Sequence, residues 1–483
     1  MRKYLLYLAA LSMLASCGDD ESSTTSDPAT LTPQMKAVFP ADGAKDIKSD
    51  SKVYVLYDRN VKQYISPTNF ITVNGENAKV TISADTLLIN VDIKPNTTYN
   101  VSVPEKTIYS SSDGTMYYAN PVNFSFKSYT TGNTPDAEIS ASPINASNAN
   151  VQKLYAFLYE NYGKKILSGS MANVSMEQNE AALVKAATGK TPLMQTFDFC
   201  FVTLTSDRST WEQNSIYQDI TYYKNLWQQG GVVSACWHLN VPSEEAYAAK
   251  NEVNNSDKAW GAQVYFSAKN AVKDGTWEND FIKFSFDKAA EVLLKYKEEG
   301  IPVVWRPFHE GSGNATISGK DSDAWFWWGK DGADAYKKLW IYMFDYFKAK
   351  GLDNLIWVWT TQIGVGSDGS ENWYCKDDSN WYPGDEYVDI IARDNYNKAQ
   401  ASASVSEFET IQKFWPNKMI ALGENGGIAK ISEIFKAGGK YSYFMPWYTY
   451  NLTDLNKSDH AKTDWWQDAA NCEDVTFLED LQK

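Results

Sequence analysis

Two glutamates carry the strongest chemical signal in this sequence. Glu310 closes the segment IPVVWRPFHE, and Glu424 closes the segment MIALGE. The apolar run in each segment predicts a buried strand, so both carboxyl groups are expected at the ends of strands. Hydrolysis of a glycosidic bond needs two carboxyl groups, one protonated to donate to the leaving oxygen and one ionised to attack the anomeric carbon or to activate water. Glu310 and Glu424 are therefore the predicted catalytic pair.

An aromatic cluster follows the first glutamate. Residues 325–328 read WFWW, and aromatic residues make up 14% of the chain, with 18 Trp and 30 Tyr. Flat aromatic faces suit the C–H face of a sugar ring, and core packing alone rarely needs so many of them. The alternative is that Arg306 and Glu310 form a structural ion pair beside a tryptophan-rich core. The coincidence of acids and aromatics in one stretch favours a sugar-binding site.

Other catalytic chemistries lack their motifs. His238, His309 and the two glutamates do not have HExxH-type spacing, so no metal is expected. The chain has neither a GxSxG elbow nor a Gly-rich phosphate loop, and we expect no cofactor. The cysteines after the N-terminal region are widely spaced, which predicts mostly buried thiols with one disulfide possible. They are Cys200, Cys236, Cys375 and Cys472.

The elements that must position these residues alternate between strands and helices. About eight strand–helix units fit into residues 151–483, a number that favours a (β/α)8 barrel over an open sheet. Such barrels carry their functional groups at the C-terminal ends of the strands, where both glutamates are expected. The predicted strands are 165–169, 192–199, 231–238, 301–306, 354–360, 388–394, 419–424 and 441–447.

The charge of the chain restricts its partners. The formal net charge is −15. Binding to nucleic acid or to an anionic membrane surface needs a basic face, so neither is expected. A neutral polysaccharide is indifferent to this charge.

The N-terminal residues have the pattern of an export signal. In residues 1–16, two basic residues precede a short apolar run that ends in small residues, as in a signal peptide. The run LASC resembles a bacterial lipobox, which would leave Cys17 as the lipidated first residue, and the alternative is a plain signal peptide with an incidental cysteine. The acidic run after Cys17 resembles the export signal of surface lipoproteins in some Gram-negative bacteria. Residues 17–32 predict a flexible tether, so we expect an outer-membrane lipoprotein, anchored by its lipid at the cell surface.

A second domain precedes the predicted barrel. Residues 33–130 contain short alternating strands separated by turn signals such as Asn74-Gly75, which predicts an all-β sandwich. The segments FPADGAKDI, ITVNGE and NTTYNVSVP resemble bacterial Ig-like domains appended to surface proteins. A spacer is the expected role, and a carbohydrate-binding module is the alternative. Residues 131–150, rich in Asn, Ser, Pro and Ala, are the predicted linker.

Five motifs in the predicted barrel resemble glycoside hydrolase family 26. They are WRPFHE (305–310), WFWWG (325–329), YPGDEYVDI leading to DNY (382–396), GENGG (423–427) and MPWY (445–448). They occur in the order of that family and extend over most of residues 140–482. The family is dominated by retaining endo-β-1,4-mannanases on a (β/α)8 barrel, so the resemblance implies β-mannan as the substrate.

The resemblance also implies residue roles. Glu310 would be the general acid/base and Glu424 the nucleophile. Tyr396 would hydrogen-bond the nucleophile, and His309 would orient it or contact the region of the sugar 2-hydroxyl. Arg306 would hold the carboxylates through charge and hydrogen bonds. The remaining substrate-binding residues would be Trp325 and Trp447 around the distorted sugar, and His238 and Trp237 at the neighbouring sugar on the non-reducing side.

Several alternatives stay open at this point. The same family contains exo-acting forms that release mannobiose, as well as enzymes that cleave xylan or mixed-linkage β-glucan. A glycan-binding surface lipoprotein without catalysis is the alternative from another class. Two carboxyl groups about 5 to 5.5 Å apart would indicate the retaining mechanism.

Overall fold

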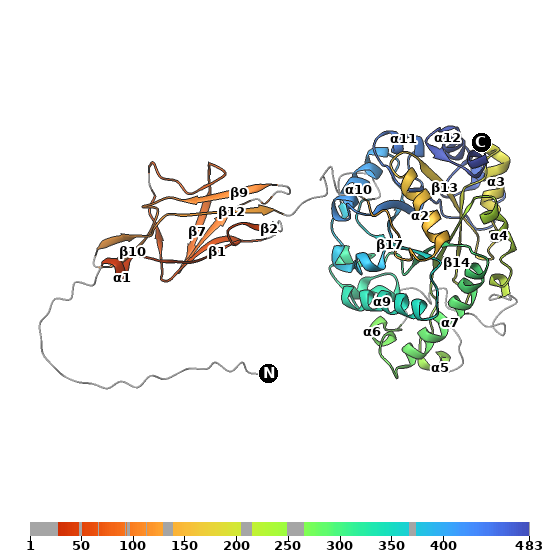
Figure 1. Cartoon of the computed structure of the whole chain (residues 1–483), viewed down its shortest axis with the longest axis horizontal. Coiled ribbons are helices and arrows are strands. Elements are labelled where there is room, and N and C mark those ends of the chain that lie inside the picture. The colour runs from red at the N-terminus through yellow and green to blue at the C-terminus, as the bar shows by residue number, and fades with distance from the viewer. Residues whose placement is uncertain are drawn as a thin grey trace, which may run out of the picture. The chain divides into compact units, whose positions relative to one another are not determined.

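The computed structural model describes residues 28–47, 51–65, 67–91, 93, 97–112, 114–128, 139–203, 215–248, 265–366 and 373–482. The chain divides into two compact units, Met1–Thr131 and Gly132–Lys483 (Figure 1). Each unit has a hydrophobic core of its own. The predicted signal peptide (residues 1–16), the predicted lipidation site Cys17 and most of the predicted tether lie outside the described residues.

The first unit is built from β-strands, as predicted. Its sheets have the orders β1-β3-β8-β7, β2-β12-β9-β5-β6 and β11-β10-β4. Alternate side chains of β12 face the core, because successive residues of a strand point to opposite faces. The strands are β1 (Met35–Phe39), β2 (Ala44–Ile47), β3 (Val53–Tyr57), β4 (Lys62–Gln63), β5 (Thr72–Val73), β6 (Glu76–Asn77), β7 (Lys79–Ser83), β8 (Thr86–Asn90), β9 (Thr98–Val103), β10 (Ile108–Ser112), β11 (Thr115–Tyr118) and β12 (Val122–Ser128).

The end of the predicted tether is structured. Residues Pro28–Leu31 form one helical turn, α1. Arg59 donates from Nη1 to the carbonyl oxygen of Thr30 at 2.6 Å, and the hydroxyl of Ser110 donates to the carbonyl oxygen of Leu31 at 2.6 Å. These hydrogen bonds tie the turn to the Ig-like unit, so the tether is shorter at its C-terminal end than the Ser/Thr-rich composition predicted.

Eight parallel strands form the predicted barrel in the second unit. Their order is β22-β13-β14-β15-β16-β17-β20-β21. The ring nearly closes where the Ser442 amide donates to the Ile420 carbonyl at 2.7 Å and the Asn425 amide donates to the Met445 carbonyl at 3.0 Å. The strands are β13 (Ile166–Met171), β14 (Met194–Asp198), β15 (Val232–Trp237), β16 (Val303–Pro307), β17 (Leu355–Thr361), β20 (Ile390–Tyr396), β21 (Met419–Gly426) and β22 (Tyr443–Phe444), and the short strands β18 (Gly364–Val365), β19 (Trp373–Cys375) and β23 (Val475–Thr476) complete the set.

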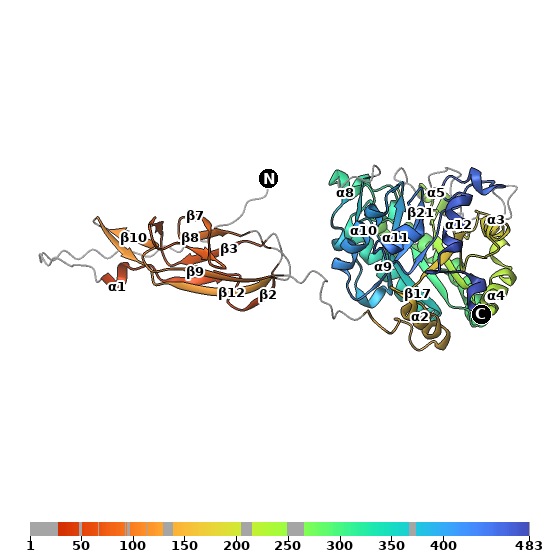
Figure 2. The ribbon, with the colours of Figure 1, turned by 90° about the horizontal axis from the view of Figure 1, so that it is seen from above.

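Helices surround this barrel (Figure 1). Seen from the side, α5 and α8, which follow β15 and β16, lie at one end of the barrel, and α2 lies at the other end (Figure 2). The end that carries α5 and α8 is therefore the C-terminal face of the strands. The helices are α2 (Ala149–Asn161), α3 (Asn179–Thr188), α4 (Thr221–Gln228), α5 (Glu245–Ala248), α6 (Ala268–Ala271), α7 (Trp277–Glu298), α8 (Ala315–Ser318), α9 (Ala333–Ala349), α10 (Ala401–Phe414), α11 (Ile431–Lys436) and α12 (Thr463–Asn471).

Part of the predicted linker belongs to the barrel. From residue 139 onward the chain packs on the second unit: the Ser140 amide donates to the Asn417 carbonyl at 3.0 Å, and the Ile144 amide donates to Asp389 at 2.8 Å. Asn148 caps α2 by accepting hydrogen bonds from the amides of Asn150 and Val151. The polar composition of this stretch reflects capping and hydrogen bonding rather than flexibility.

The four cysteines of the described residues are free, so the disulfide that their spacing left possible is not formed. Cys200, Cys236 and Cys375 are buried and Cys472 is half-buried, each without a disulfide. Within the described part of the chain, no helix combines the length and the apolar character that crossing a membrane requires.

Candidate active site

Glu310 and Glu424 both lie at the C-terminal face of the barrel. Glu424 is part of β21, and Glu310 follows β16 by three residues. Glu424 is 6% exposed, and Glu310 is half-buried. The barrel therefore brings together two carboxyl groups that are more than a hundred residues apart in the sequence.

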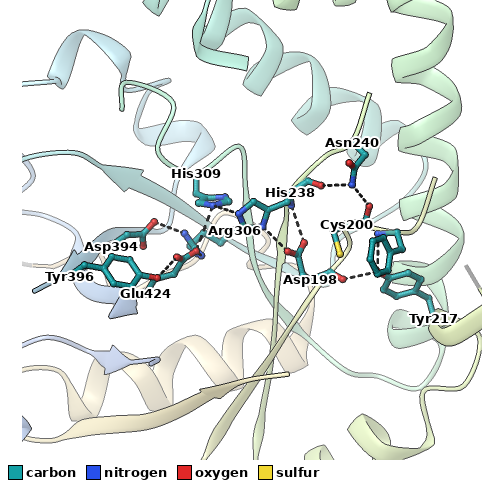
Figure 3. A network of polar contacts seen from close by, with 11 residues as sticks. Asp198, Cys200, Tyr217, His238, Asn240, Arg306, His309, Asp394, Tyr396 and Glu424 are labelled. Atoms are coloured by element: carbon teal, nitrogen blue, oxygen red, sulfur yellow. Dashed lines mark hydrogen bonds and ion pairs between the residues drawn. The ribbon is translucent and has the colours of Figure 1, made fainter. Parts of the chain in front are cut away.

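Hydrogen-bond donors surround the carboxylate of Glu424 (Figure 3). Arg306 donates from Nη2 to Oε1, and the Tyr396 hydroxyl donates to Oε2 at 2.8 Å. Hydrogen bonds to an ionised group are stronger than those between neutral groups, so this arrangement stabilises the carboxylate form. The sequence had predicted that Arg306 and Tyr396 contact the carboxylate of Glu424.

The guanidinium of Arg306 joins two carboxylates. Its Nη1 donates to Oδ2 of Asp394 at 2.9 Å and to the Thr360 hydroxyl at 3.3 Å. Asp394 is the register partner of Glu424 on the neighbouring strand. A Cβ atom on Gly423 would lie 2.8 Å from Oδ1 of Asp394, so a residue without a side chain is required for the pair to fit.

A strained turn presents Glu310. Phe308 and Glu310 have φ angles of 44° and 53°, in the left-handed region that residues with a side chain seldom occupy. The hydroxyl of Tyr336 donates to the Phe308 carbonyl at 2.8 Å, and Nε1 of Trp328 donates to the His309 carbonyl at 2.9 Å. These two donors hold a turn that places one glutamate beyond the strand end.

The two glutamates differ in their electrostatic surroundings. Burial, followed by the negative charge of Glu424, raises the pKa of Glu310 to about 7, although Arg393, Arg306 and His238 act in the opposite direction. Among the described residues, no arginine forms an ion pair with Glu310 like the one that Arg306 forms with Glu424. The geometry therefore favours a protonated Glu310 next to an ionised Glu424, as acid and nucleophile require.

We expect kcat/KM on a glycan to fall as the pH rises through about 7, because the protonated form of Glu310 is lost there. Glu310→Ala should lower hydrolysis of the glycan by about 10²- to 10⁴-fold. An aryl glycoside with a dinitrophenolate leaving group needs no acid, so the variant should still release a burst of the phenolate, without the fall above pH 7. Glu298→Ala, an exposed substitution on α7, is the control. A fall above pH 7 that persists in Glu310→Ala would contradict the assignment.

Two histidines lie near Glu424. Nε2 of His309 is 3.6 Å from Oε1 of Glu424 and 3.1 Å from Nε2 of His238. Burial, then the charges of His238 and Arg306, lower the pKa of His309 well below its ordinary value. His309 is therefore a neutral imidazole at neutral pH.

Half-buried aromatic rings border these histidines. The ring centroid of Phe326 lies 5.2 Å from that of His309, and the centroid of Trp447 lies 5.5 Å from that of His238. Trp325 is half-buried and lies 6.4 Å from Tyr374 at an interplanar angle of 30°. Trp447 and Trp325 thus keep partly open rings at the site, as a sugar-binding role requires.

The other two tryptophans of the WFWW run are part of the core. Trp327 and Trp328 are both 0% exposed. Their indole N–H groups donate to the carbonyl oxygens of Leu239 and His309, each at 2.9 Å. These hydrogen bonds fix the segments that follow β15 and β16, which contain the two histidines. Neither indole ring is exposed, so neither can stack on a ligand.

The structure does not support the role expected for Trp237. Its side chain is 1% exposed and packs against Phe199, Phe286 and Trp305, with centroid distances of 6.3, 6.2 and 6.0 Å. Because successive residues of a strand point to opposite faces, Trp237 faces the helix layer while His238 faces the site. A ring enclosed in this way cannot contact a sugar.

Three further residues of the site were missed by sequence reasoning. Asp198, at the end of β14, contacts His238, and Tyr374, on β19, has its pKa raised to about 12 by burial and by nearby groups that include Glu310. His460 lies in a polar stretch of the sequence, yet it is half-buried with its ring 5.7 Å from that of Tyr396. An acidic end to a predicted strand was the available signal for Asp198, and no local signal marked the other two.

The carboxylates of Asp394 and Glu424, together with His309, offer atoms within 4.8 Å of one another, a spacing that a metal ion could use. Arg306 donates to both carboxylates, however, and its fixed positive charge already occupies the position of a counter-ion. The donor set is therefore better described as an arginine–carboxylate network than as a metal site.

A (β/α)8 barrel with two unequal glutamates and partly open aromatic rings at its C-terminal face has the architecture of a glycoside hydrolase. Comparison with known proteins agrees. The model of glycosyl hydrolase family 26 matches residues 144–468, and a bacterial Ig-like domain model matches residues 29–128. The chain belongs to glycosyl hydrolase family 26 and carries an N-terminal bacterial Ig-like domain.

Several relatives are mannanases by name. A mannan endo-1,4-beta-mannosidase B from Piromyces sp is 31% identical over 306 residues, 61% of this chain and 46% of that protein. The chain spans less than half the length of this relative and of the mannan endo-1,4-beta-mannosidase A from the same source, of which it covers 43%. A mannan endo-1,4-beta-mannosidase from Thermothelomyces thermophilus is 27% identical, covering 72% of this chain and 65% of that one.

Solved structures of the family superpose on the barrel. The GH26 domain of an endo-beta-mannanase/endo-beta-glucanase from Prevotella bryantii is 38% identical, with a TM-score of 0.62, covering 71% of this chain and 100% of that one. A beta-mannanase from a symbiotic protist of the termite Reticulitermes speratus, in complex with a gluco-manno-oligosaccharide, is 31% identical, with a TM-score of 0.58, covering 71% and 98%.

Proposed function

We propose that this protein is a retaining endo-β-1,4-mannanase that hydrolyses mannan, galactomannan or glucomannan, with Glu424 as the nucleophile and Glu310 as the general acid/base. The unequal surroundings of the two glutamates carry this proposal. Arg306 and Tyr396 donate to the carboxylate of Glu424, whereas burial and the charge of Glu424 raise the pKa of Glu310 to about 7. The named relatives support mannan as the substrate.

In the first step, the Glu424 carboxylate attacks the anomeric carbon while Glu310 transfers its proton to the departing glycosidic oxygen. A covalent glycosyl–enzyme forms, and the shortened glycan leaves. In the second step, the Glu310 carboxylate removes a proton from water, the resulting hydroxyl bonds to the anomeric carbon, and Glu424 is released as a carboxylate. Both groups end in their starting protonation states.

Product analysis tests the substrate and the mode of cleavage. A soluble form beginning at Glu21 should produce a ladder of manno-oligosaccharides from linear mannan and galactomannan, and Glu424→Ala should abolish it. Mannobiose as the sole product would replace endo action with exo action. Hydrolysis of xylan or mixed-linkage β-glucan instead of mannan would replace the proposed substrate. Binding to mannan without hydrolysis of any glycan would favour the glycan-binding protein.

We also propose that lipid on Cys17 anchors the protein in the outer membrane at the cell surface, with the Ig-like domain as a spacer. The LASC run and the acidic residues after it support this proposal. Labelled fatty acid should be incorporated into the parent protein and not into Cys17→Ala, which should leave the membrane fraction. Protease added to intact cells should remove the anchored protein, and protection from it would contradict the surface location.

A further inference from the structure

Asp198 holds His238 through both of its carboxylate oxygens. Oδ1 accepts from the His238 backbone amide at 2.9 Å, and Oδ2 lies 2.6 Å from Nδ1 of the imidazole (Figure 3). Asp198 is 6% exposed. An ionised carboxylate only accepts hydrogen bonds, so Nδ1 of His238 must carry a proton.

The carboxylate itself sits on a braced segment. The Tyr217 hydroxyl donates to the Asp198 carbonyl at 2.7 Å, and the Phe199 amide donates to the Cys236 carbonyl at 3.0 Å. The Asn240 side-chain amide donates to the Cys200 carbonyl at 2.5 Å. The ends of β14 and β15 are therefore joined, and Asp198 has little freedom to move relative to His238.

The opposite edge of His238 faces the nucleophile through His309. The two Nε2 atoms are 3.1 Å apart, and Nε2 of His309 lies 3.6 Å from Oε1 of Glu424. Nδ1 of His309 is buried and has no hydrogen-bond partner among the described residues. Among the described residues, the polar contacts that orient the His309 ring are therefore those at Nε2, in addition to its packing against Phe326 and Trp328.

From this geometry we propose that Asp198 is a positioning residue, which acts through His238 to hold the His309 imidazole against the nucleophile Glu424. The continuous contact from Asp198 through His238 and His309 to Glu424 carries the inference. The effect of Asp198 on catalysis rests on the function proposed for Glu424. Its effect on the arrangement of the two imidazoles does not depend on that function.

Several charged groups act on His238. Burial lowers the pKa of His238, but the charge and hydrogen bond of Asp198 outweigh burial, Glu424 adds to them and Arg306 opposes them, so the pKa is raised above its ordinary value. The neutral imidazole of His309 faces it from the end of β16. Asp198 is thus the main group that keeps His238 protonated.

Asp198→Asn tests the proposal with little change of shape. An amide has one accepting oxygen, so either the backbone amide or Nδ1 of His238 must face an NH₂ group and lose its acceptor. We expect kcat on mannan to fall by about 10- to 100-fold, because the misplacement of a group beside the reacting atoms has effects of this size. KM should change by less than about threefold, since His238 and the open aromatic rings remain. Asp198→Ala should lower kcat at least as much.

Nuclear magnetic resonance of the full chain labelled with ¹⁵N-histidine gives a second readout, since the chain has 3 His. The parent should show a proton on Nδ1 of His238. In Asp198→Asn, the titration of His238 should move to lower pH by about 1 to 3 units, the usual effect of one close opposite charge. The signals of His309 should change with it, and those of His460 should not.

Asp389→Asn is the matched control. Asp389 is also buried and accepts hydrogen bonds from the backbone amides of Ile144 and Trp357, each at 2.8 Å, at the opposite end of β20 from the site. This variant should lose stability and keep kcat and the histidine signals. An Asp198→Asn variant with parental kcat, or with unchanged signals from His238 and His309, would overturn the proposal. If the histidine signals change in Asp198→Asn but the parent protein hydrolyses no glycan, the positioning role of Asp198 would stand and the proposed function would not.

Discussion

Replacement of Glu424 by glutamine is expected to lower kcat on mannan by about 10⁴- to 10⁶-fold, the range found when a covalent nucleophile is removed. The amide is a poor nucleophile, and Arg306 and Tyr396 would then donate toward a group with only one accepting oxygen. The thermal midpoint should change little, because glutamine has nearly the shape of glutamate and Arg306 keeps its ion pair with Asp394. Initial rates on mannan and a thermal melt together check both expectations.

Glu409→Gln is the control for this substitution, because Glu409 is exposed on α10. Added azide should restore cleavage of an activated aryl mannoside by Glu424→Ala and yield the α-mannosyl azide, since the anion attacks from the face that the nucleophile occupied. The parent enzyme should release β-anomeric products first. Release of the α-anomer first by the parent would contradict the retaining mechanism, and a full rate in Glu424→Gln would contradict the residue assignment.

The second large effect concerns Arg306. Arg306→Met should destabilise the barrel by about 3 to 5 kcal/mol, the usual cost of removing one partner of a buried ion pair. Asp394 and Glu424 would then lie buried next to each other without the guanidinium that joins them. Activity should fall as well, because Glu424, the proposed nucleophile, loses the hydrogen bond from the guanidinium. Thermal melts that resolve the barrel transition, with initial rates below that transition, measure the two effects.

Arg59→Met is the matched arginine control. Arg59 pairs with Asp58 in the Ig-like unit, where both side chains are partly exposed, at 32% and 24%. Exposed ion pairs of this kind contribute little to stability, and this one lies outside the barrel, so the barrel transition should not move. Arg306→Lys should recover part of the stability, because a single ammonium replaces the charge but not the fork of donors. A parental melting temperature for Arg306→Met would show that the buried network does not stabilise the fold.

The sequence by itself predicted the architecture, and it predicted that Glu310 and Glu424 lie at one face of the barrel. Short apolar runs such as 301–306 and 419–424 have the length and composition of buried parallel strands, and their regular alternation with helical segments leaves few folds other than a barrel. A strand end in such a barrel is a fixed place, so Glu310 and Glu424 could be assigned to one face without coordinates. Local motifs were sufficient to place the two glutamates, because the position of a strand in the barrel fixes the position of the residues at its end.

Only the tertiary structure decided which neighbours act together. Trp237 and His238 are adjacent in sequence, but successive residues of a strand point to opposite faces, so Trp237 faces the helix layer and His238 contacts His309 in the site. Tyr374 and His460 join the site from loops and a short strand that no local pattern marks. Side-chain packing also leaves the ring of Trp325 partly exposed, whereas it buries the rings of Trp327 and Trp328. Contacts between distant segments depend on the exact closure of the barrel, and that closure is a property of the whole chain.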